Sequence, residues 1–495
     1  MKPVNHIQLW TVALILVTGG CQNPKNQADP CKEAGNEHYS AVEIDNVLCG
    51  YAVDRQCLVT EKEKEILYQS GEVMLKLTIL DQGVDVRINL LFRLDPKTDR
   101  WFYNKSMIDN GSARLETSTE IRGDTAYFET NQGISRKKVF LPTGTELATS
   151  ISYPYLVRDF IKAGKTDSSY RVYDFMSGAI ADKQYIKKSE EDILLNDSAY
   201  NSIVVEETDN STGVKTTIWL ESATGFPLKY LVAGRNIYLA DRSVVGRITK
   251  VNYDNVIFAR VNMLIPEFRH LTYMNVRARI ESAGEVLSVG GLNRPGQKFK
   301  GTVNDNLIDG VFELERIRYD GAGAPPFPPD FNQQPELKKY LEPERLIESN
   351  EQMIVEEARR ITEGSKDSWE AATRLSKWVS ENIEGAIPGG TSAINTYKTR
   401  QGECGSHSRL LAALCRAVGI PARLSIGCSY TTLYHGSFGQ HAWNEVYMGE
   451  AGWIAIDATF YENDYIDAGH IRLGEALTFM PREMEILEYS MENIK

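Results

Sequence analysis

The chain has 495 residues, of which 42% are hydrophobic and 25% are charged, a balance typical of folded globular proteins rather than disordered ones. Its length exceeds that of one ordinary domain and predicts two to four domains. The formal net charge of -12 argues against the basic surface that nucleic-acid phosphates require, so we expect no nucleic-acid partner.

Residues 1–20 have the composition of an export signal. Lys2 precedes the apolar run 9–17, which is shorter than the ~20 residues that span a bilayer, and small residues follow it. Two glycines and then Cys21 resemble the lipobox of bacterial lipoproteins, with Thr18 in place of the usual aliphatic residue. The resemblance implies signal removal, lipidation of Cys21 and an outer-membrane location facing the periplasm or the cell surface. Plain secretion with an incidental Cys21 is the alternative.

The polar residues after Cys21 predict a tether over 21–37, before the first folded domain. An exported chain can form disulfides. Cys49 and Cys57 lie close together in the sequence, and we expect them to form a pair. Cys31 competes for either partner, so the spacing leaves the connectivity open.

From about residue 38 to 320 the hydrophobic pattern has a period of two. In residues 84–92 aliphatic and aromatic side chains alternate with mostly polar ones, which indicates a half-buried antiparallel strand. Similar runs recur between turn clusters rich in Asp, Asn and Gly. They occupy residues 73–79, 125–129, 170–175, 215–220 and 228–232. We therefore predict a β-rich domain over 38–250 and a small β domain over 251–320.

Residues 321–335 predict a linker, because their clustered prolines and glycines cannot sustain a helix or a central strand. Beyond the linker the hydrophobic period becomes helical, and residues 343–361 predict one helix. A second helix is predicted to begin at Asp367, because Asp367 and Glu370 have the spacing of an N-terminal capping box.

Cys404 directly precedes a leucine-rich helical pattern that stops at Gly419. We therefore expect its thiol at a helix N-terminus. There the free backbone N–H groups and the helix dipole stabilise a thiolate, and the same N–H groups can stabilise an oxyanion on an attacked carbonyl. Gln401 is one candidate for a second oxyanion donor, and a tryptophan of the preceding helix is another.

His441 lies on a predicted strand, and Asp457 lies on the returning strand after the glycine-rich turn 449–452. Both positions are odd-numbered, so the hairpin places them on one face, directly opposite or one diagonal apart. His441 can then exchange a proton with Cys404 while the Asp457 carboxylate orients the imidazole.

These motifs, Gly-x-Cys before a helix ending in Gly-Ile-Pro-Ala-Arg, then His-Ala-Trp, then Trp-x-x-x-Asp, resemble the transglutaminase-like superfamily over roughly residues 335–465. The resemblance implies an α+β fold with a papain-like core over 336–495, preceded by the β-rich antiparallel region. It implies a Cys404–His441–Asp457 triad that attacks amide bonds of a protein or peptide substrate. Ser408 stands where the family commonly has a small apolar residue.

We favour hydrolysis for an exported enzyme of this kind. Protein-glutamine crosslinking is one alternative, and a binding or assembly module that uses the thiol fold only as a scaffold is another. No sequence feature predicts a cofactor. We predict no metal site, because Cys404 and His407 are the only closely spaced pair of candidate ligands and zinc sites usually show paired motifs. The oligomeric state is left open.

Overall fold

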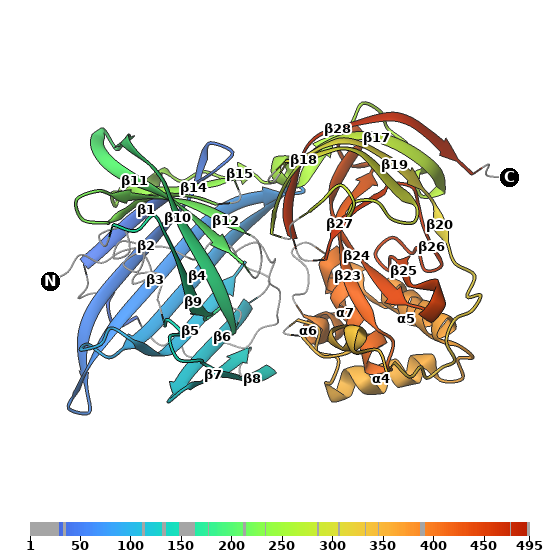
Figure 1. The fold of residues 1–495 in the computed structure, drawn as a ribbon, viewed down its shortest axis with the longest axis horizontal. Coiled ribbons are helices and arrows are strands. Elements are labelled where there is room, and N and C mark those ends of the chain that lie inside the picture. The colour runs from blue at the N-terminus through green and yellow to red at the C-terminus, as the bar shows by residue number, and fades with distance from the viewer. Residues whose placement is uncertain are drawn as a thin grey trace. The chain divides into compact units, whose positions relative to one another are not determined.

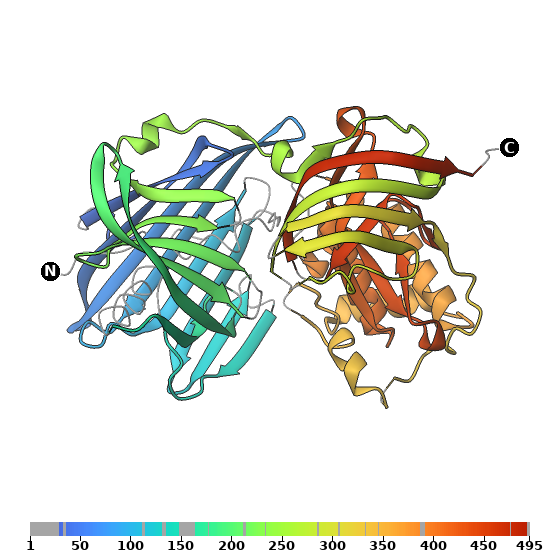
Figure 2. The ribbon, with the colours of Figure 1, turned by 45° about the horizontal axis from the view of Figure 1, so that its top comes forward.

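The chain divides into two compact units, Met1–Tyr253 and Asp254–Lys495 (Figures 1 and 2). The computed structural model describes residues 29–32, 36–110, 114–130, 135–147, 164–176, 178–210, 214–232, 234–284, 287–304, 307–331, 333–344, 346–386, 392–475 and 477–492. The predicted signal peptide and Cys21 lie outside these ranges. Within them, no helix is both long enough and apolar enough to cross a membrane.

The first unit is built on one strongly curved antiparallel sheet, so the predicted β-rich N-terminal region is confirmed (Figure 1). Its strands follow the order β8-β7-β6-β5-β4-β3-β2-β1-β14-β13-β12-β11-β10-β9, and β15 pairs in parallel with β3. Their bounds are β1 Asn36–Ile44, β2 Val47–Glu61, β3 Lys64–Ile79, β4 Gln82–Leu94, β5 Trp101–Asp109, β6 Arg114–Arg122, β7 Thr125–Thr130, β8 Ser135–Phe140, β9 Asp167–Asp174, β10 Ala179–Leu195, β11 Ser198–Asp209, β12 Lys215–Glu221, β13 Pro227–Val232, β14 Arg235–Ala240 and β15 Val251–Asn252. The short helix α2, Val244–Arg247, lies between β14 and β15.

The alternating pattern predicted over residues 84–92 is found in β4. Every second side chain there is buried, which places one face of the strand in the core. Strand β3 pairs with β4 through a tight turn, and the turn residues Leu80 and Asp81 both have positive φ. Such turns match the twist of the two strands they join.

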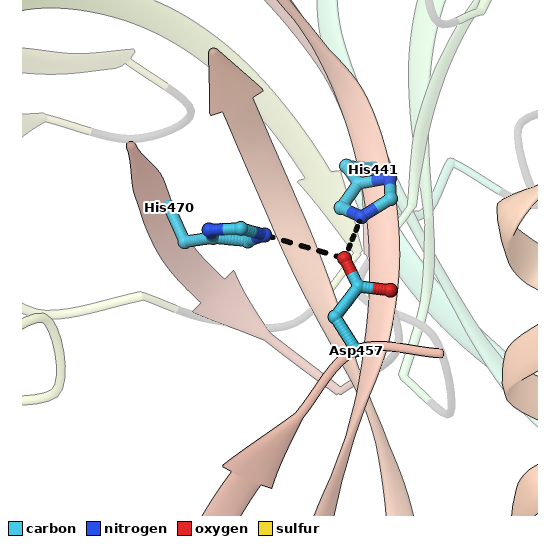
Figure 3. Close-up of side chains that lie close together, drawn as sticks. All are labelled: His441, Asp457 and His470. Atoms are coloured by element: carbon cyan, nitrogen blue, oxygen red, sulfur yellow. Dashed lines mark hydrogen bonds and ion pairs between the residues drawn. The ribbon is translucent and has the colours of Figure 1, made fainter. Parts of the chain in front are cut away.

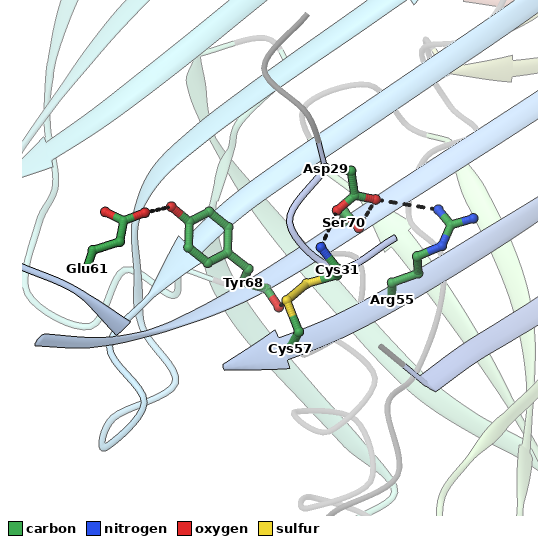
Figure 4. Close-up of a disulfide and its surroundings, with 7 residues drawn as sticks. All are labelled: Asp29, Cys31, Arg55, Cys57, Glu61, Tyr68 and Ser70. Atoms are coloured by element: carbon green, nitrogen blue, oxygen red, sulfur yellow. Dashed lines mark hydrogen bonds and ion pairs between the residues drawn. A yellow bond between two sulfur atoms is a disulfide. The ribbon is translucent and has the colours of Figure 1, made fainter. Parts of the chain in front are cut away.

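The predicted Cys49–Cys57 pair is wrong, since Cys57 is bonded to Cys31 (Figure 4). Cys49 and Cys57 both lie on β2, where an extended chain advances about 3.3 Å per residue and keeps the two thiols far apart. Cys49 is a buried free thiol. The neighbouring Asp29 also attaches this segment to the sheet, because its carboxylate accepts from the Ser70 hydroxyl at 2.8 Å.

The second unit has three layers. A five-stranded sheet, β16-β24-β23-β27 with β25 beside β24, lies between a helical layer and a four-stranded sheet, β18-β19-β17-β28. The strands are β16 Phe258–Arg260, β17 Leu271–Gly284, β18 Gln297–Asn304, β19 Leu307–Glu315, β20 Ile317–Arg318, β21 Glu384–Gly385, β22 Gln401–Gly402, β23 Ala422–Thr431, β24 Ser437–Tyr447, β25 Trp453–Ile456, β26 Tyr465–Ile466, β27 His470–Gly474 and β28 Leu477–Met491. The helices are α3 Asp254–Ile257, α4 Gln352–Thr362, α5 Ser368–Asn382, α6 Ala393–Thr399 and α7 Cys404–Ala417.

Strand β17 pairs with β28, which follows it by about two hundred residues in the chain. Residues 254–320 and the segment predicted as catalytic therefore share one unit and one apolar core. The predicted linker also lies within this unit, where the ring of Phe331 packs against Tyr447 at 5.6 Å. Pairing between strands so distant in sequence leaves no trace in local hydrophobic periodicity.

The helix predicted over 343–361 is wrong in its first half, because α4 begins at Gln352. Glu351, the residue before it, is extended, with ψ 133°. The predicted start of α5 is confirmed. The Asp367 carboxylate accepts from the amide of Glu370 at 2.8 Å, and the Glu370 carboxylate accepts from the amide of Lys366 at 3.0 Å.

Candidate active site

Helix α7 begins at Cys404, as the sequence predicts, and its leucine-rich face is fully buried in the helical layer. The residue two positions earlier is Gly402, where an added Cβ would lie only 2.4 Å from the Cβ of Ser406. The glycine in the Gly-x-Cys motif is thus needed for the chain to turn tightly into the helix. The Cys404 side chain at this turn remains partly exposed.

The N-terminus of α7 is capped by Glu403. Its carboxylate accepts from the amides of Gly405 at 2.6 Å and Ser406 at 2.9 Å, and the guanidinium of Arg409 lies 3.7 Å away. The thiol of Cys404 donates to the same carboxylate at 3.5 Å. Two of the N–H groups expected to stabilise a thiolate or an oxyanion are therefore already bonded.

This cap changes the expected state of the thiol. Burial raises the pKa of Cys404, and the negative charge of Glu403 raises it further, whereas the amide of Ala442 donates toward the sulfur and lowers it. The net direction is upward. Cys404 in this arrangement is held as a thiol, rather than as the helix-stabilised thiolate that its position in the sequence predicts.

His441 and Asp457 are in direct contact, with Nε2 of His441 2.7 Å from Oδ2 of Asp457 (Figure 3). Strand β24 carries His441, and Asp457 directly follows β25, whose last residue Ile456 pairs with Asn444. The two side chains are therefore one diagonal apart, as the parity of their positions predicts. Both are buried.

The Asp457 carboxylate is held from several sides. Its Oδ1 accepts from the amide of Thr459 at 2.8 Å, while its Oδ2 faces His441 and His470. Burial alone would raise the pKa of Asp457, but His441 and then His470 outweigh burial and hold that pKa well below its usual range. Asp457 is thus an ionised partner that fixes the orientation of the His441 ring. Because Nε2 is bonded to it, Nδ1 is the nitrogen available for a thiol proton.

Contacts between α7 and β24 hold the first turns of the helix against the part of the strand next to His441. The hydroxyl of Ser408 lies 2.8 Å from the carbonyl oxygen of Cys404 and 3.0 Å from that of Ala442. The side-chain amide of Asn444 donates to the backbone carbonyl of Ser408 at 2.9 Å. A small apolar residue at position 408 could not join the helix to the strand in this way.

Two aromatic side chains pack on the His441 ring. Phe460 stacks on it with ring centres 4.5 Å apart and planes 13° apart, and Trp443 lies at 5.8 Å and 21°. Trp443 lies two positions after His441 in β24, so the two side chains share one face of the strand. Phe460 belongs to the loop after Asp457, so no strand periodicity could place it there.

A second buried histidine, His470, lies behind the His441–Asp457 pair (Figure 3). Its Nε2 is 3.4 Å from Oδ2 of Asp457, and its Nδ1 is 3.0 Å from Oδ1 of Asp467. Buried Glu462 completes this group, with Oε2 accepting from the amide of Asp467 at 3.0 Å. None of these three residues could be predicted from the sequence, because isolated His, Asp and Glu residues form no motif.

Among the described residues, two trios bring potential ligand atoms within 4.8 Å of one another: His441, Asp457 and His470, and Glu462, Asp467 and His470. Both ring nitrogens of His470, however, lie within hydrogen-bonding distance of carboxylate oxygens. A metal-binding imidazole must instead present a free lone pair to the ion. The arrangement is that of a hydrogen-bonded cluster.

Gln401, the candidate oxyanion donor, has its side-chain amide 3.4 Å from the carboxylate of Glu384, and it is exposed. No described contact joins it to Cys404. His407 is buried, and its two ring nitrogens lie near the backbone carbonyls of Glu403 and Ile383. His407 therefore joins the start of α7 to the C-terminal end of α5 and is not directed at the thiol.

Comparison with known proteins gives the same assignment for this region. Residues 356–458 match the family model of the transglutaminase-like superfamily, which confirms the resemblance seen in the motifs. A curated protein-glutamine gamma-glutamyltransferase from Pseudomonas aeruginosa is 35% identical over 72 residues, which are 13% of this chain and 11% of that protein. The chain thus spans about a tenth of the length of this curated relative.

Two solved structures are similar to parts of the chain. A Cytophaga hutchinsonii protein provisionally named a cysteine protease has 18% identity and a TM-score of 0.32, with 45% of this chain and 90% of that chain covered. A β-barrel-like protein of a domain of unknown function, from Brucella abortus, has 8% identity and a TM-score of 0.31, with 42% of this chain and 96% of that chain covered.

Proposed function

Because residues 356–458 form a transglutaminase-like domain, we propose that the second unit is a papain-like thiol enzyme acting on amide bonds of proteins or peptides. The observation that carries this proposal is the 2.7 Å contact between His441 and Asp457, on a strand that α7 joins through the 3.0 Å contact between the Ser408 hydroxyl and the carbonyl oxygen of Ala442. Nucleophile, base and orienting carboxylate are thus supplied by three neighbouring elements.

The chemistry follows from these contacts. Nδ1 of His441 takes the thiol proton as the Cys404 sulfur attacks the amide carbonyl carbon, and a tetrahedral intermediate forms. The carbon–nitrogen bond then breaks, and the departing amine takes the same proton from Nδ1. A thioester on Cys404 remains. Asp457 keeps its charge throughout, since its role is to orient His441 and to stabilise the imidazolium.

The second half of the reaction decides the product. If water attacks the thioester, His441 takes the proton of the water and returns it to the sulfur, so an acid is released and the enzyme is a hydrolase. If an amine attacks instead, a new amide forms and the enzyme is a crosslinker. We favour hydrolysis for an exported chain. The identity to a protein-glutamine gamma-glutamyltransferase supports amine transfer as the second candidate.

Alkylation of Cys404 tests the thiol chemistry. We expect an iodoacetamide-type probe to label Cys404 in the native protein, and the label to be lost in Cys404→Ala and strongly slowed in His441→Ala. Burial raises the pKa of Cys415 to about 12 and that of Cys49 to about 11, so these thiols are expected to stay unlabelled. Labelling of Cys404 that is insensitive to His441→Ala would reject the catalytic proposal and favour the scaffold alternative.

Mass spectrometry of a glutamine peptide incubated with the protein and a primary amine separates the two reactions. Conversion of the glutamine amide to an acid indicates hydrolysis, and an amine adduct indicates transfer. Cys404→Ala is the control for both. Either product establishes the thioester chemistry. If no peptide of a library gives either product, the scaffold alternative is favoured.

We further propose that the protein is exported and anchored by a lipid on Cys21. This proposal rests on the signal-like composition of residues 1–20 and on the lipobox-like residues before Cys21. Palmitate incorporation in the producing cells, compared with Cys21→Ala, tests it. A parent protein that takes up no palmitate is secreted without an anchor, or is not exported at all.

A further inference from the structure

Behind the His441–Asp457 pair lies the buried side chain of His470, which none of the motifs includes. We propose that His470 is a positioning residue, a doubly protonated imidazole that holds the Asp457 carboxylate in place for His441. The proposal rests on the thiol chemistry proposed above, although the protonation of His470 is a property of the folded protein whatever the reaction is.

The loop that follows β25 is built as one closed cluster. Asp457 and Glu462 exchange backbone hydrogen bonds of 2.9 Å in both directions. Oδ1 of Asp467 accepts from the amide of Gly469 at 2.6 Å, and this bond turns the chain into β27. Strand β27 begins at His470, which pairs with Ser429 in β23. The backbone thus holds His470 at a fixed position against Asp457.

Proton counting gives the charge of the imidazole. One ring nitrogen of His470 is 3.4 Å from Oδ2 of Asp457, and the other is 3.0 Å from Oδ1 of Asp467. An ionised carboxylate only accepts hydrogen bonds, so both nitrogens must carry a proton and the ring is an imidazolium. A neutral ring would leave one nitrogen lone pair facing a carboxylate in a buried site, which is costly.

Glu462 completes the proton balance. Burial, and next the neighbouring Asp467, raise the pKa of Glu462 well above its usual range, so it is a neutral acid. Oε1 of Glu462 and Oδ2 of Asp467 are both buried, and neither has a hydrogen-bond partner. A proton on Glu462 shared with Asp467 satisfies both atoms. The cluster behind His441 then holds two carboxylates and one imidazolium.

This charge balance bears on His441. The ionisable groups that face His470 are Asp457, Asp467, Glu462 and His441, whose ring centre is 5.6 Å away. The guanidinium of Arg269 lies over the ring of Phe460. The positive charge of His470 partly offsets that of Asp457 as felt by His441. Its removal leaves the negative charge of Asp457 less compensated, and that charge raises the pKa of Cys404.

The test compares His470→Gln with His270→Gln. His270 lies in the short turn directly before β17, outside the cluster. The pH dependence of Cys404 alkylation is measured for both. We expect His470→Gln to move the midpoint upward and to slow alkylation about 10- to 100-fold, a loss typical of removing a partner that orients a functional group. We expect His270→Gln to match the parent. If the midpoint of the pH dependence of alkylation were the same in His470→Gln as in the parent, His470 would be only a structural residue and the proposal would be overturned.

A second measurement stays valid if His470→Gln does not fold or if the thiol is unreactive. Nitrogen-15 NMR of histidine-labelled Cys404→Ala protein at neutral pH reports the protonation of each ring. We expect one histidine with both nitrogens protonated, assigned to His470 through its sequential correlations to Gly469 and Ile471. A singly protonated His470, or a stoichiometric divalent metal in the purified protein, overturns the proposal. Unreactive Cys404 with a doubly protonated His470 would instead reject the proposed enzyme activity alone.

Discussion

Substitution Glu403→Gln should make Cys404 more reactive. The substitution removes a carboxylate that lies 3.5 Å from the sulfur and favours the protonated thiol. Two unit charges at this distance interact by about 1 kcal/mol in water and about 5 kcal/mol at an effective dielectric constant of 20. Arg409 and the helix amides already offset part of the charge of Glu403. We therefore expect the pKa of Cys404 to fall by about one to two units.

The assay is the rate of alkylation at fixed neutral pH. A lower pKa raises the thiolate fraction but also makes each thiolate less nucleophilic, so the rate should rise about three- to fourfold for each unit. An overall gain of about three- to sixteenfold follows. Glu403→Gln also weakens the N-cap of α7, and a loss of about 1 kcal/mol in the free energy of unfolding should accompany the gain.

Arg409→Gln is the matched control with the opposite sign. It removes the cation 3.7 Å from Glu403 and should leave the carboxylate more effective in raising the pKa of Cys404, so alkylation should slow. Circular dichroism and the melting temperature establish that each variant is folded. If the Glu403→Gln protein is folded and its Cys404 is alkylated no faster than in the parent, the electrostatic reasoning is refuted.

Three further substitutions test Asp457 in the candidate site, the buried face of α7 and the disulfide of the first unit. Asp457→Asn should reduce acyl-transfer kcat about 10²- to 10⁴-fold, while the matched change Asp464→Asn, at an exposed carboxylate of the same loop, should have no effect on kcat. Because the pKa of Asp457 is depressed in the folded protein, its contribution to stability is present above its unfolded pKa of about 3.9 and is lost as the pH falls; acid titration of the melting temperature should therefore be shallower in Asp457→Asn. Leu411→Ala, in the fully buried face of α7, should lower the free energy of unfolding by about 2 to 5 kcal/mol in a denaturant titration. Cys31→Ser should destabilise the first unit by about 3.5 kcal/mol, the loop-closure value for its sequence separation of 26, and unchanged melting of this variant would mean that the bond does not constrain the unfolded chain.

Local patterns were sufficient where one short segment contains the whole signal. The alternation in β4, the capping box of α5 and the helix start at Cys404 all depend on residues a few positions apart, and the structure has them as predicted. The contact between His441 and Asp457 could also be anticipated. Both lie on one hairpin, and the parity of a hairpin fixes which side chains share a face.

Features that depend on the path of the chain between distant segments could not be predicted. The Cys31–Cys57 bond requires the segment before β1 to return to β2, and the pairing of β17 with β28 joins the two ends of the second unit. His470 reaches Asp457 only because the intervening loop closes on itself. Glu403 could be named as a capping residue type, but its position against the sulfur depends on the side-chain conformation.

Strand β28 also sets the order in which the second unit can be completed. Ribosomes make it after every residue of the candidate site, yet its side chains Phe479, Met484 and Ile486 form part of the core beneath β17. The backbone of Ile486 is bonded in both directions to the side chain of Asn262, near the start of the unit. When Cys404 and His441 have left the ribosome, the core beneath β17 therefore still lacks the side chains of β28. We expect an active thiol only after synthesis has passed β28, which keeps the nucleophile unassembled while the chain is being made.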